Sequence, residues 1–235
     1  MTSEAKRIAS HLCISQRLLN HQVVGIGSGS TIVYAVEKIS QLHKDGKLQL
    51  KALIPSSFQA MDLINKHNLP LGTLNQYPKI DITFDGCDEF DKDLNLIKGG
   101  GGCHLLEKLI IQNSKECYIV CDYTKESEVL GTNWYKGVPL EVIPQSYKAV
   151  QLKLISLGAS SVEVRMAKMK AGPVITDEGN MIIDAKFGQI TNPMELNDKL
   201  LKICGIVETG LFCQMVNGIY LGMQDGTAKF TEYQN

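Results

Sequence analysis

Short apolar segments alternate with helical segments along the first 131 residues, and this alternation limits the folds open to the chain. The apolar segments, which predict strands, are residues 22–27, 48–55 and 116–121, together with the start of 79–91, where a strand runs into an acidic turn. The helical segments are residues 3–19, 30–46 and 57–68, and a further helix follows the glycine run at 99–102. Such alternation predicts an α/β fold: a Rossmann-like, mostly parallel sheet that helices cover on both faces. Ligands of such sheets bind beyond the carboxyl ends of the strands.

Beyond Gly131 the pattern changes to paired strands. Predicted strands at 139–144 and 160–167 flank a predicted helix at 145–158, and residues 173–188 read as two strands joined at 177–180. A helix at 192–204 follows, and strands return at 205–212 and 218–230. We therefore expect a Rossmann-like catalytic domain of residues 1–131 and 206–235, with a smaller inserted α+β domain of residues 132–205.

The composition argues against several classes of protein. The 235 residues include 24 basic and 25 acidic side chains, so no excess of positive charge favours nucleic acid or a membrane surface as a partner. The seven cysteines form no CxxC pair and the five histidines are scattered, so we expect neither a disulfide framework nor a metal site. The first residues, MTSEAKRIAS, lack the apolar core of a secretory leader, and we expect a cytoplasmic protein.

The loop GIGSGST (25–31) lies between a predicted strand and a predicted helix. Glycine-rich turns at helix N-termini present backbone N–H groups to phosphate, and Ser28, Ser30 and Thr31 would add hydroxyl groups. The dinucleotide fingerprint is not met, because Ser30 replaces its third glycine and no carboxylate follows the second strand. A tight turn with Ser30 as the helix N-cap is the alternative.

Four carboxylates fall within DGCDEFD (85–91), at the end of a predicted strand. A solvated acidic turn or a divalent-cation loop would explain them, although the spacing differs from that of an EF-hand. Asp85 and Asp88 share one compact turn, and such a pair suits hydrogen bonding to sugar hydroxyls.

The segment KGGGGCHLLEK (98–108) combines a lysine, four glycines and a helix that carries Glu107. Taken singly, these are a surface lysine, a flexible hinge and a helix-face charge. Four glycines are costly in conformational entropy, however, and the segment lies between a short strand and a helix, as GIGSGST does. We therefore expect the two glycine loops to follow neighbouring strands and to converge on one crevice.

The motifs, taken in order, resemble those of the type A ribose-5-phosphate isomerases. The resemblance extends from about residue 5 to the C-terminus. It rests on SGST (28–31), DGCDEFD (85–91), KGGGGC with LLEK (98–108), CDYTK (121–125), PVITDEGN (173–180) and GIVETGLF (205–212).

The resemblance implies an aldose–ketose isomerase that interconverts D-ribose 5-phosphate and D-ribulose 5-phosphate through an enediolate, in the non-oxidative pentose phosphate pathway. Glu107 would move a proton between C2 and C1, and Lys98 would stabilise the oxyanion. Asp85 and Asp88 would contact sugar hydroxyls and assist ring opening. The implied substrate-binding residues are Lys6, Ser28, Gly29, Ser30, Thr31, Asp85, Gly86, Cys87, Asp88, Lys98, Gly99, Gly100, Gly101 and Lys125, of which Lys6, Ser28–Thr31 and Lys125 would hold the phosphate.

The chemistry of such a reaction suits these residue types. Removal of a proton beside a carbonyl needs a base, which a partly buried carboxylate provides, and the enediolate charge needs a cation and backbone donors. No metal or cofactor is required, and we expect a homodimer or homotetramer with the inserted unit as subunit contact. Two alternative functions remain. One is a coenzyme A transferase, which has a similar fold and also uses a glutamate. The other is a sugar-phosphate sensor without catalytic activity.

Overall fold

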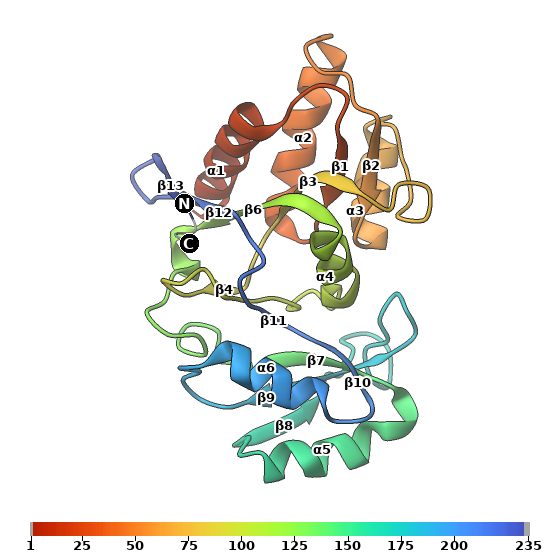
Figure 1. The fold of residues 1–235 in the computed structure, drawn as a ribbon, viewed down its shortest axis with the longest axis vertical. Coiled ribbons are helices and arrows are strands. Elements are labelled where there is room, and N and C mark those ends of the chain that lie inside the picture. Colours follow the sequence, from red (N-terminus) through yellow and green to blue (C-terminus); the bar gives the residue numbers. More distant parts are fainter. Residues whose placement is uncertain (1, 233–235) are drawn as a thin grey trace. The chain divides into compact units, whose positions relative to one another are not determined.

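The computed structural model describes residues 2–232, which form two compact units (Figure 1). The first unit contains residues 2–87, 106–124 and 215–232, and the second contains Asp88–Leu105 and Lys125–Gln214. The second unit thus takes in residues 88–105, which the expected boundaries at 131 and 206 assign to the catalytic domain. The domain boundaries stay a prediction.

The first unit is built on a six-stranded sheet with the strand order β13-β12-β6-β3-β1-β2. Neighbouring strands are parallel, except that β12 and β13 are antiparallel, which confirms the expected mostly parallel sheet. The strands are β1 (Val23–Ile26), β2 (Ala52–Pro55), β3 (Ile80–Asp85), β6 (Ser114–Asp122), β12 (Gly218–Gly222) and β13 (Ala228–Glu232).

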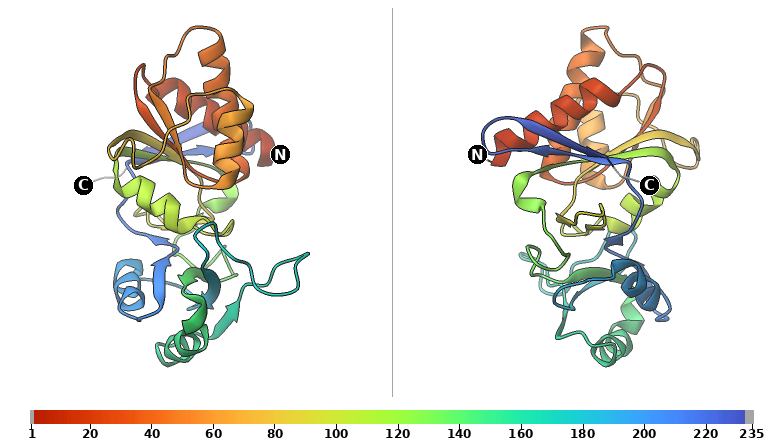
Figure 2. Two further views of the ribbon diagram at one scale, coloured as in Figure 1. Left: turned by 90° about the vertical axis from the view of Figure 1, so that its right-hand side faces the viewer. Right: turned by 60° about the vertical axis from the view of Figure 1, so that its left-hand side comes forward.

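Helices cover both faces of this sheet, as Figure 2 shows. One face packs against α1 (Thr2–Arg17), α2 (Ser30–Lys44) and α3 (Phe58–Lys66), and the other against α4 (His104–Gln112). Because side chains alternate along a strand, Val24 and Ile26 of β1 join the core beneath α1–α3, whereas Val23 joins Ile110 of α4. No helix in the described part of the chain is long and apolar enough to cross a membrane.

The second unit contains two antiparallel sheets, in agreement with the expected α+β character. A four-stranded sheet has the order β10-β7-β9-β8, and a three-stranded sheet has the order β11-β5-β4. The strands are β4 (Glu89–Phe90), β5 (Leu96–Ile97), β7 (Val138–Val142), β8 (Ser161–Val164), β9 (Met181–Lys186), β10 (Ile206–Thr209) and β11 (Leu211–Phe212). The helices are α5 (Tyr147–Ser156) and α6 (Pro193–Leu201), and a single 3-10 turn occupies Pro144–Ser146. Another 3-10 turn, Tyr123–Lys125, spans the point at which the chain passes from the first unit to the second.

The expected pair of strands within residues 173–188 is only half formed. Its second strand is β9, but its first makes only isolated bridges, such as Ile175 with Met181. The reason lies in the connecting turn, where the Thr176 hydroxyl and the Asn180 amide donate to the buried Glu141 carboxylate at 2.7 and 2.9 Å. These bonds anchor the segment to β7.

Candidate active site

Two of the predicted functional segments begin at one edge of the parallel sheet. In register, Ile26 of β1 lies beside Phe84 of β3, so the loop at 27–29 and the acidic turn at 85–88 start side by side. Parallel strands end at the same edge, so this placement follows from the topology.

The expectation that the second glycine loop follows a neighbouring strand of this sheet is wrong. The strand before Gly99 is β5, which pairs antiparallel with β4 and β11 in the separate three-stranded sheet. The glycine run therefore belongs to the second unit, and only the helix after it, α4, packs on the parallel sheet.

Asp85 lies directly beneath the first glycine loop. Its carboxylate is fully buried, and its Oδ1 accepts hydrogen bonds from the N–H groups of Ser28 and Gly86, at 3.2 and 2.7 Å. A Cβ atom added to Gly27 would lie 1.9 Å from this oxygen, so only glycine permits the approach. The loop and the acidic turn are thereby joined through one carboxylate.

The N-terminus of α2 is capped differently from the expected arrangement. Gly29, not Ser30, is the N-cap residue, and its φ of 101° favours glycine. Ser30 is the first helical residue, and its hydroxyl accepts a hydrogen bond from the Lys6 ammonium at 3.1 Å. Lys6 also lies 3.8 Å from the buried carboxylate of Asp122, at the end of β6. A cation is thus held beside a helix N-terminus, which is the arrangement that suits phosphate.

Sequence reasoning missed several partners of this loop. The Ser28 hydroxyl lies 2.9 and 2.7 Å from those of Ser56 and Ser57, and the Gly29 N–H donates to Gln59 at 2.8 Å. The sequence held one indication of these contacts: Ser56 directly follows β2, and β2 lies beside β1 in the sheet.

The four carboxylates of the acidic turn divide into two pairs. Glu89 is fully buried and accepts hydrogen bonds from the Ser127 hydroxyl and from the N–H groups of residues 131–133. Asp91 accepts from Asn95 and from the N–H of Asp93, and burial raises the pKa of its carboxyl. Glu89 and Asp91 therefore hold loops of the second unit together, which leaves Asp85 and Asp88 as the candidates for substrate contact.

The four glycines form a turn. At three of the four positions, the backbone conformation or a neighbouring side chain explains why the residue is glycine. Gly99 and Gly102 have φ values of 99° and 82°, and the Gly102 N–H donates to the Gly99 carbonyl at 3.0 Å. A Cβ atom on Gly100 would lie 2.6 Å from Asp88 and 2.8 Å from the Trp134 ring. Only at Gly101 would an added Cβ meet no atom within 4 Å. Gly101 is therefore the position where the turn offers open space to a substrate.

Lys98, immediately before the turn, is held in a buried position. Its side chain is 3% exposed, its N–H donates to the Gly210 carbonyl at 2.8 Å, and its ammonium lies 5.4 Å from the centre of the Phe212 ring. The Lys98 ammonium is therefore held in a buried place next to the glycine turn in sequence.

Glu107 lies in the first turn of α4 and is 5% exposed. The close approach of α4 to the sheet depends on Gly25, because a Cβ there would lie 2.6 Å from Ile110. A carboxylate side chain is one of the groups that can act as a general base.

The predicted site residues thus fall into two groups. The first unit holds Lys6, Ser28, Gly29, Ser30, Thr31, Asp85, Gly86, Cys87 and Glu107, and the second holds Asp88, Lys98, Gly99, Gly100, Gly101 and Lys125. Direct contacts join Lys6 to Ser30 and Asp85 to Ser28 in the first unit, and Asp88 to Gly100 in the second. Within residues 2–232 no three His, Cys, Asp or Glu side chains are grouped as metal ligands.

A cavity of about 220 Å³ lies elsewhere in the second unit. Its walls include Trp134, Tyr135 and Phe187, and none of the predicted site residues lines it. Since no carboxylate lines this cavity, we do not assign the reaction to it.

Comparison with known proteins defines the class of this chain. Residues 52–226 match the family described as ribose 5-phosphate isomerase A (phosphoriboisomerase A). The ribose-5-phosphate isomerase of Sus scrofa is 46% identical over 229 residues, which are 97% of this chain and 74% of the pig protein.

Two solved structures have the same fold. A D-ribose-5-phosphate isomerase in complex with phospho-erythronic acid has a TM-score of 0.94 and 35% identity, over 99% of both chains. The ribose 5-phosphate isomerase A of Methanocaldococcus jannaschii has a TM-score of 0.90 and 35% identity, over 97% of this chain and 98% of its own.

These matches make the chain an isomerase. More particularly, it belongs to the ribose 5-phosphate isomerase A family, as the motifs predict. The coenzyme A transferase and the non-catalytic sensor are thereby set aside.

The geometry of the glycine turn predicts different effects for two variants, Gly101→Ala and Gly99→Ala. Gly101→Ala adds a methyl group in open space, so the melting temperature should stay within about 2 °C of the wild-type value. If substrate lies against this position, kcat/KM should fall about tenfold or more, which corresponds to roughly 1.4 kcal/mol.

Gly99→Ala is the matched control. It forces a positive φ on alanine, at a cost of roughly 1–2 kcal/mol, and crowds the His104 ring 2.7 Å away, so the melting temperature should fall clearly. Thermal unfolding and steady-state kinetics measure both variants. Normal kcat/KM for Gly101→Ala would show that the substrate does not approach this position.

Proposed function

We propose that the interconversion of D-ribose 5-phosphate and D-ribulose 5-phosphate, a step of the non-oxidative pentose phosphate pathway, proceeds in this chain through an enediolate formed by Glu107. The observation that carries the proposal is the continuity of one segment. A buried lysine, a glycine turn with one open position and a buried carboxylate follow one another between Lys98 and Glu107. These are the cation, the backbone donor and the base that the reaction needs.

The proton transfers follow from the structures of substrate and product. Glu107 removes the proton from C2 of the open-chain aldose, and the C–H electrons form the C1–C2 double bond while the carbonyl electrons move to O1. The Lys98 ammonium and the Gly101 N–H stabilise the charge on O1. Glu107 then delivers its proton to C1, and the O2 proton passes to O1, which leaves the ketone at C2. Asp85 and Asp88 accept hydrogen bonds from the sugar hydroxyls and assist ring opening.

The substrate phosphate is proposed to bind at the N-terminus of α2. Lys6 beside Ser30 supplies a positive charge there, and Ser28 and Thr31 supply hydroxyl groups. Lys125, in the 3-10 turn after β6, adds a second cation. The bound phospho-erythronic acid of the related structure supports a site for a phosphorylated sugar acid, whose planar carboxylate resembles an enediolate.

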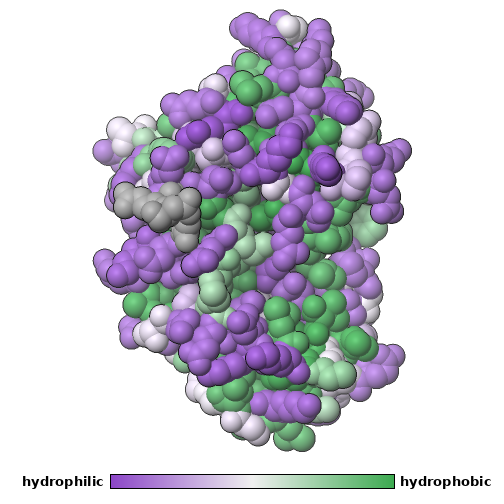
Figure 3. Space-filling model, in the orientation of Figure 1, coloured by the Kyte–Doolittle hydropathy of each residue, from purple (hydrophilic) through white to green (hydrophobic). Residues whose placement is uncertain are grey.

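We further propose that the enzyme uses no metal or cofactor and acts in the cytoplasm as a homodimer or homotetramer. Figure 3 shows hydrophobic side chains at the surface of the second unit, and Leu152 and Ile155 of α5 are 67% and 57% exposed. Burial of such side chains against a second copy would be favourable, which supports the second unit as the subunit contact.

The Glu107→Gln variant tests the base directly. Glutamine keeps the size of the side chain and its helix position but cannot accept the C2 proton. We expect kcat to fall by about a thousandfold or more, with KM for ribose 5-phosphate changed less than about threefold. The measurement is a steady-state assay of ribulose 5-phosphate formation.

Glu116→Gln is the control, because Glu116 is an exposed carboxylate on β6 and lies in the same unit. It should leave both constants unchanged. Near-normal turnover by Glu107→Gln would move the role of base to Asp85 or Asp88.

The phosphate assignment predicts a different kinetic signature. Thr31→Ala and Lys125→Ala remove contacts made equally to substrate and transition state, so KM should rise about tenfold and kcat should change little. Competitive inhibition by inorganic phosphate should weaken in parallel. Unchanged KM in both variants would place the phosphate elsewhere.

A further inference from the structure

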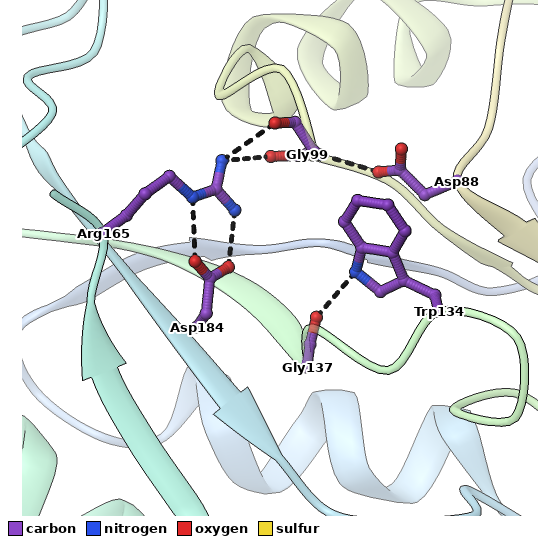
Figure 4. A network of polar contacts seen from close by, with 7 residues as sticks. Asp88, Gly99, Trp134, Gly137, Arg165 and Asp184 are labelled. Carbon is purple, nitrogen blue, oxygen red and sulfur yellow. Dashed lines mark hydrogen bonds and ion pairs between the residues drawn. The ribbon is translucent and has the colours of Figure 1, made fainter. Parts of the chain in front are cut away.

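Arg165 connects the four-stranded sheet of the second unit to the glycine turn. It directly follows β8, and its side chain is 18% exposed. Its Nε and Nη2 donate to the two carboxylate oxygens of Asp184 on β9, and its Nη1 donates to the carbonyls of Gly99 and Gly100 at 2.8 and 3.2 Å. Figure 4 shows the guanidinium between Asp184 and the turn. The arginine therefore has a fixed orientation, set by the bidentate pair.

The turn is held from both sides. The Gly99–Gly100 peptide presents its carbonyl to Arg165, while its N–H donates to the Asp88 carboxylate at 2.6 Å. Glycine has no side chain to restrict its backbone, so the orientation of these peptide groups depends on such partners. Asp88 alone would fix only one of the two exposed peptide groups.

The second of these peptides links Gly100 to Gly101. Peptide bonds in the described chain are all trans, so the N–H of Gly101 points opposite to the Gly100 carbonyl. Because that carbonyl is turned toward Arg165, the Gly101 N–H is turned away from it. The guanidinium charge also polarises the peptide and makes this N–H a stronger donor.

We propose that Arg165, oriented by Asp184, is a positioning residue for the isomerisation: it fixes the glycine turn so that the Gly101 N–H faces the oxyanion that forms on O1. This inference rests on the proposed function, which places O1 at the turn. Arg165 itself does not contact the substrate. Its effect is on the transition state, because the charge on O1 is greatest there.

Arg165→Met tests the proposal, with Lys199→Met as the matched control. Lys199 forms an exposed ion pair with Glu195 on α6 in the same unit. We expect Arg165→Met to lower kcat by about 10- to 100-fold, less than the loss of a donor itself, with KM for ribose 5-phosphate within about threefold. The affinity for phospho-erythronic acid should weaken by a similar factor to kcat, and Lys199→Met should change none of these values.

Two further variants separate positioning from folding. Asp184→Asn keeps the arginine charge but loosens its orientation, so kcat should fall less than in Arg165→Met. Arg165→Lys keeps one donor and should recover part of the lost kcat. A purely structural role would lower the melting temperature and the fraction of active enzyme, measured by titration with phospho-erythronic acid, but would leave kcat per active site unchanged.

The outcomes also distinguish this inference from the proposed function. The positioning role would be overturned if Arg165→Met had the wild-type kcat per active site. If Arg165→Met does not fold, wild-type kcat in both Asp184→Asn and Arg165→Lys would overturn it. If Gly101→Ala still lowers kcat/KM, the assignment of the turn stands while the role of Arg165 fails. If Gly101→Ala has no effect, the proposed oxyanion site fails, and the positioning role fails with it.

Discussion

The parallel pairing of β1, β3 and β6 is the constraint on which the first unit's share of the site depends. Parallel strands end at one edge of the sheet, so the chain leaves β1, β3 and β6 at neighbouring points. The glycine loop, Asp85 and Asp122 are the residues found there. The register has no room for a side chain at Gly27, whose place is taken by the Asp85 carboxylate. The short loop after β1 thus leads directly into α2, and the N-terminus of α2 lies beside Lys6.

The second unit holds four consecutive glycines in one defined conformation. Positive φ angles and neighbouring side chains account for Gly99, Gly100 and Gly102. Asp88 and Arg165 then fix the peptide groups from two sides. The entropy cost of glycine is therefore offset by polar partners from distant parts of the sequence, and one position, Gly101, remains open.

The sequence predicted the parallel sheet, its covering helices and the α+β character of the second unit, because strand and helix periodicities are local properties. It also placed the first glycine loop and Asp85 at the ends of predicted strands, and both follow parallel strands in the structure. It failed for the glycine run, because the two-residue strand β5 gives no sign of the sheet it joins. The roles of Glu89, Arg165 and Trp134 depend on contacts across tens of residues, which periodicity does not encode. The roles of Glu107, Lys98 and the phosphate-binding residues stay predictions.

The most direct test of the central claim is the fate of the C2 hydrogen. The isomerisation of ribose 5-phosphate can be run in D₂O and the ribulose 5-phosphate analysed by NMR for deuterium at C1. A proton carried by Glu107 passes through an exchangeable carboxylic acid, so the account predicts that a measurable fraction of the product contains solvent deuterium at C1. Complete transfer of the original C2 hydrogen to C1, with no deuterium in product or recovered substrate, would contradict proton transfer through an exchangeable carboxylic acid.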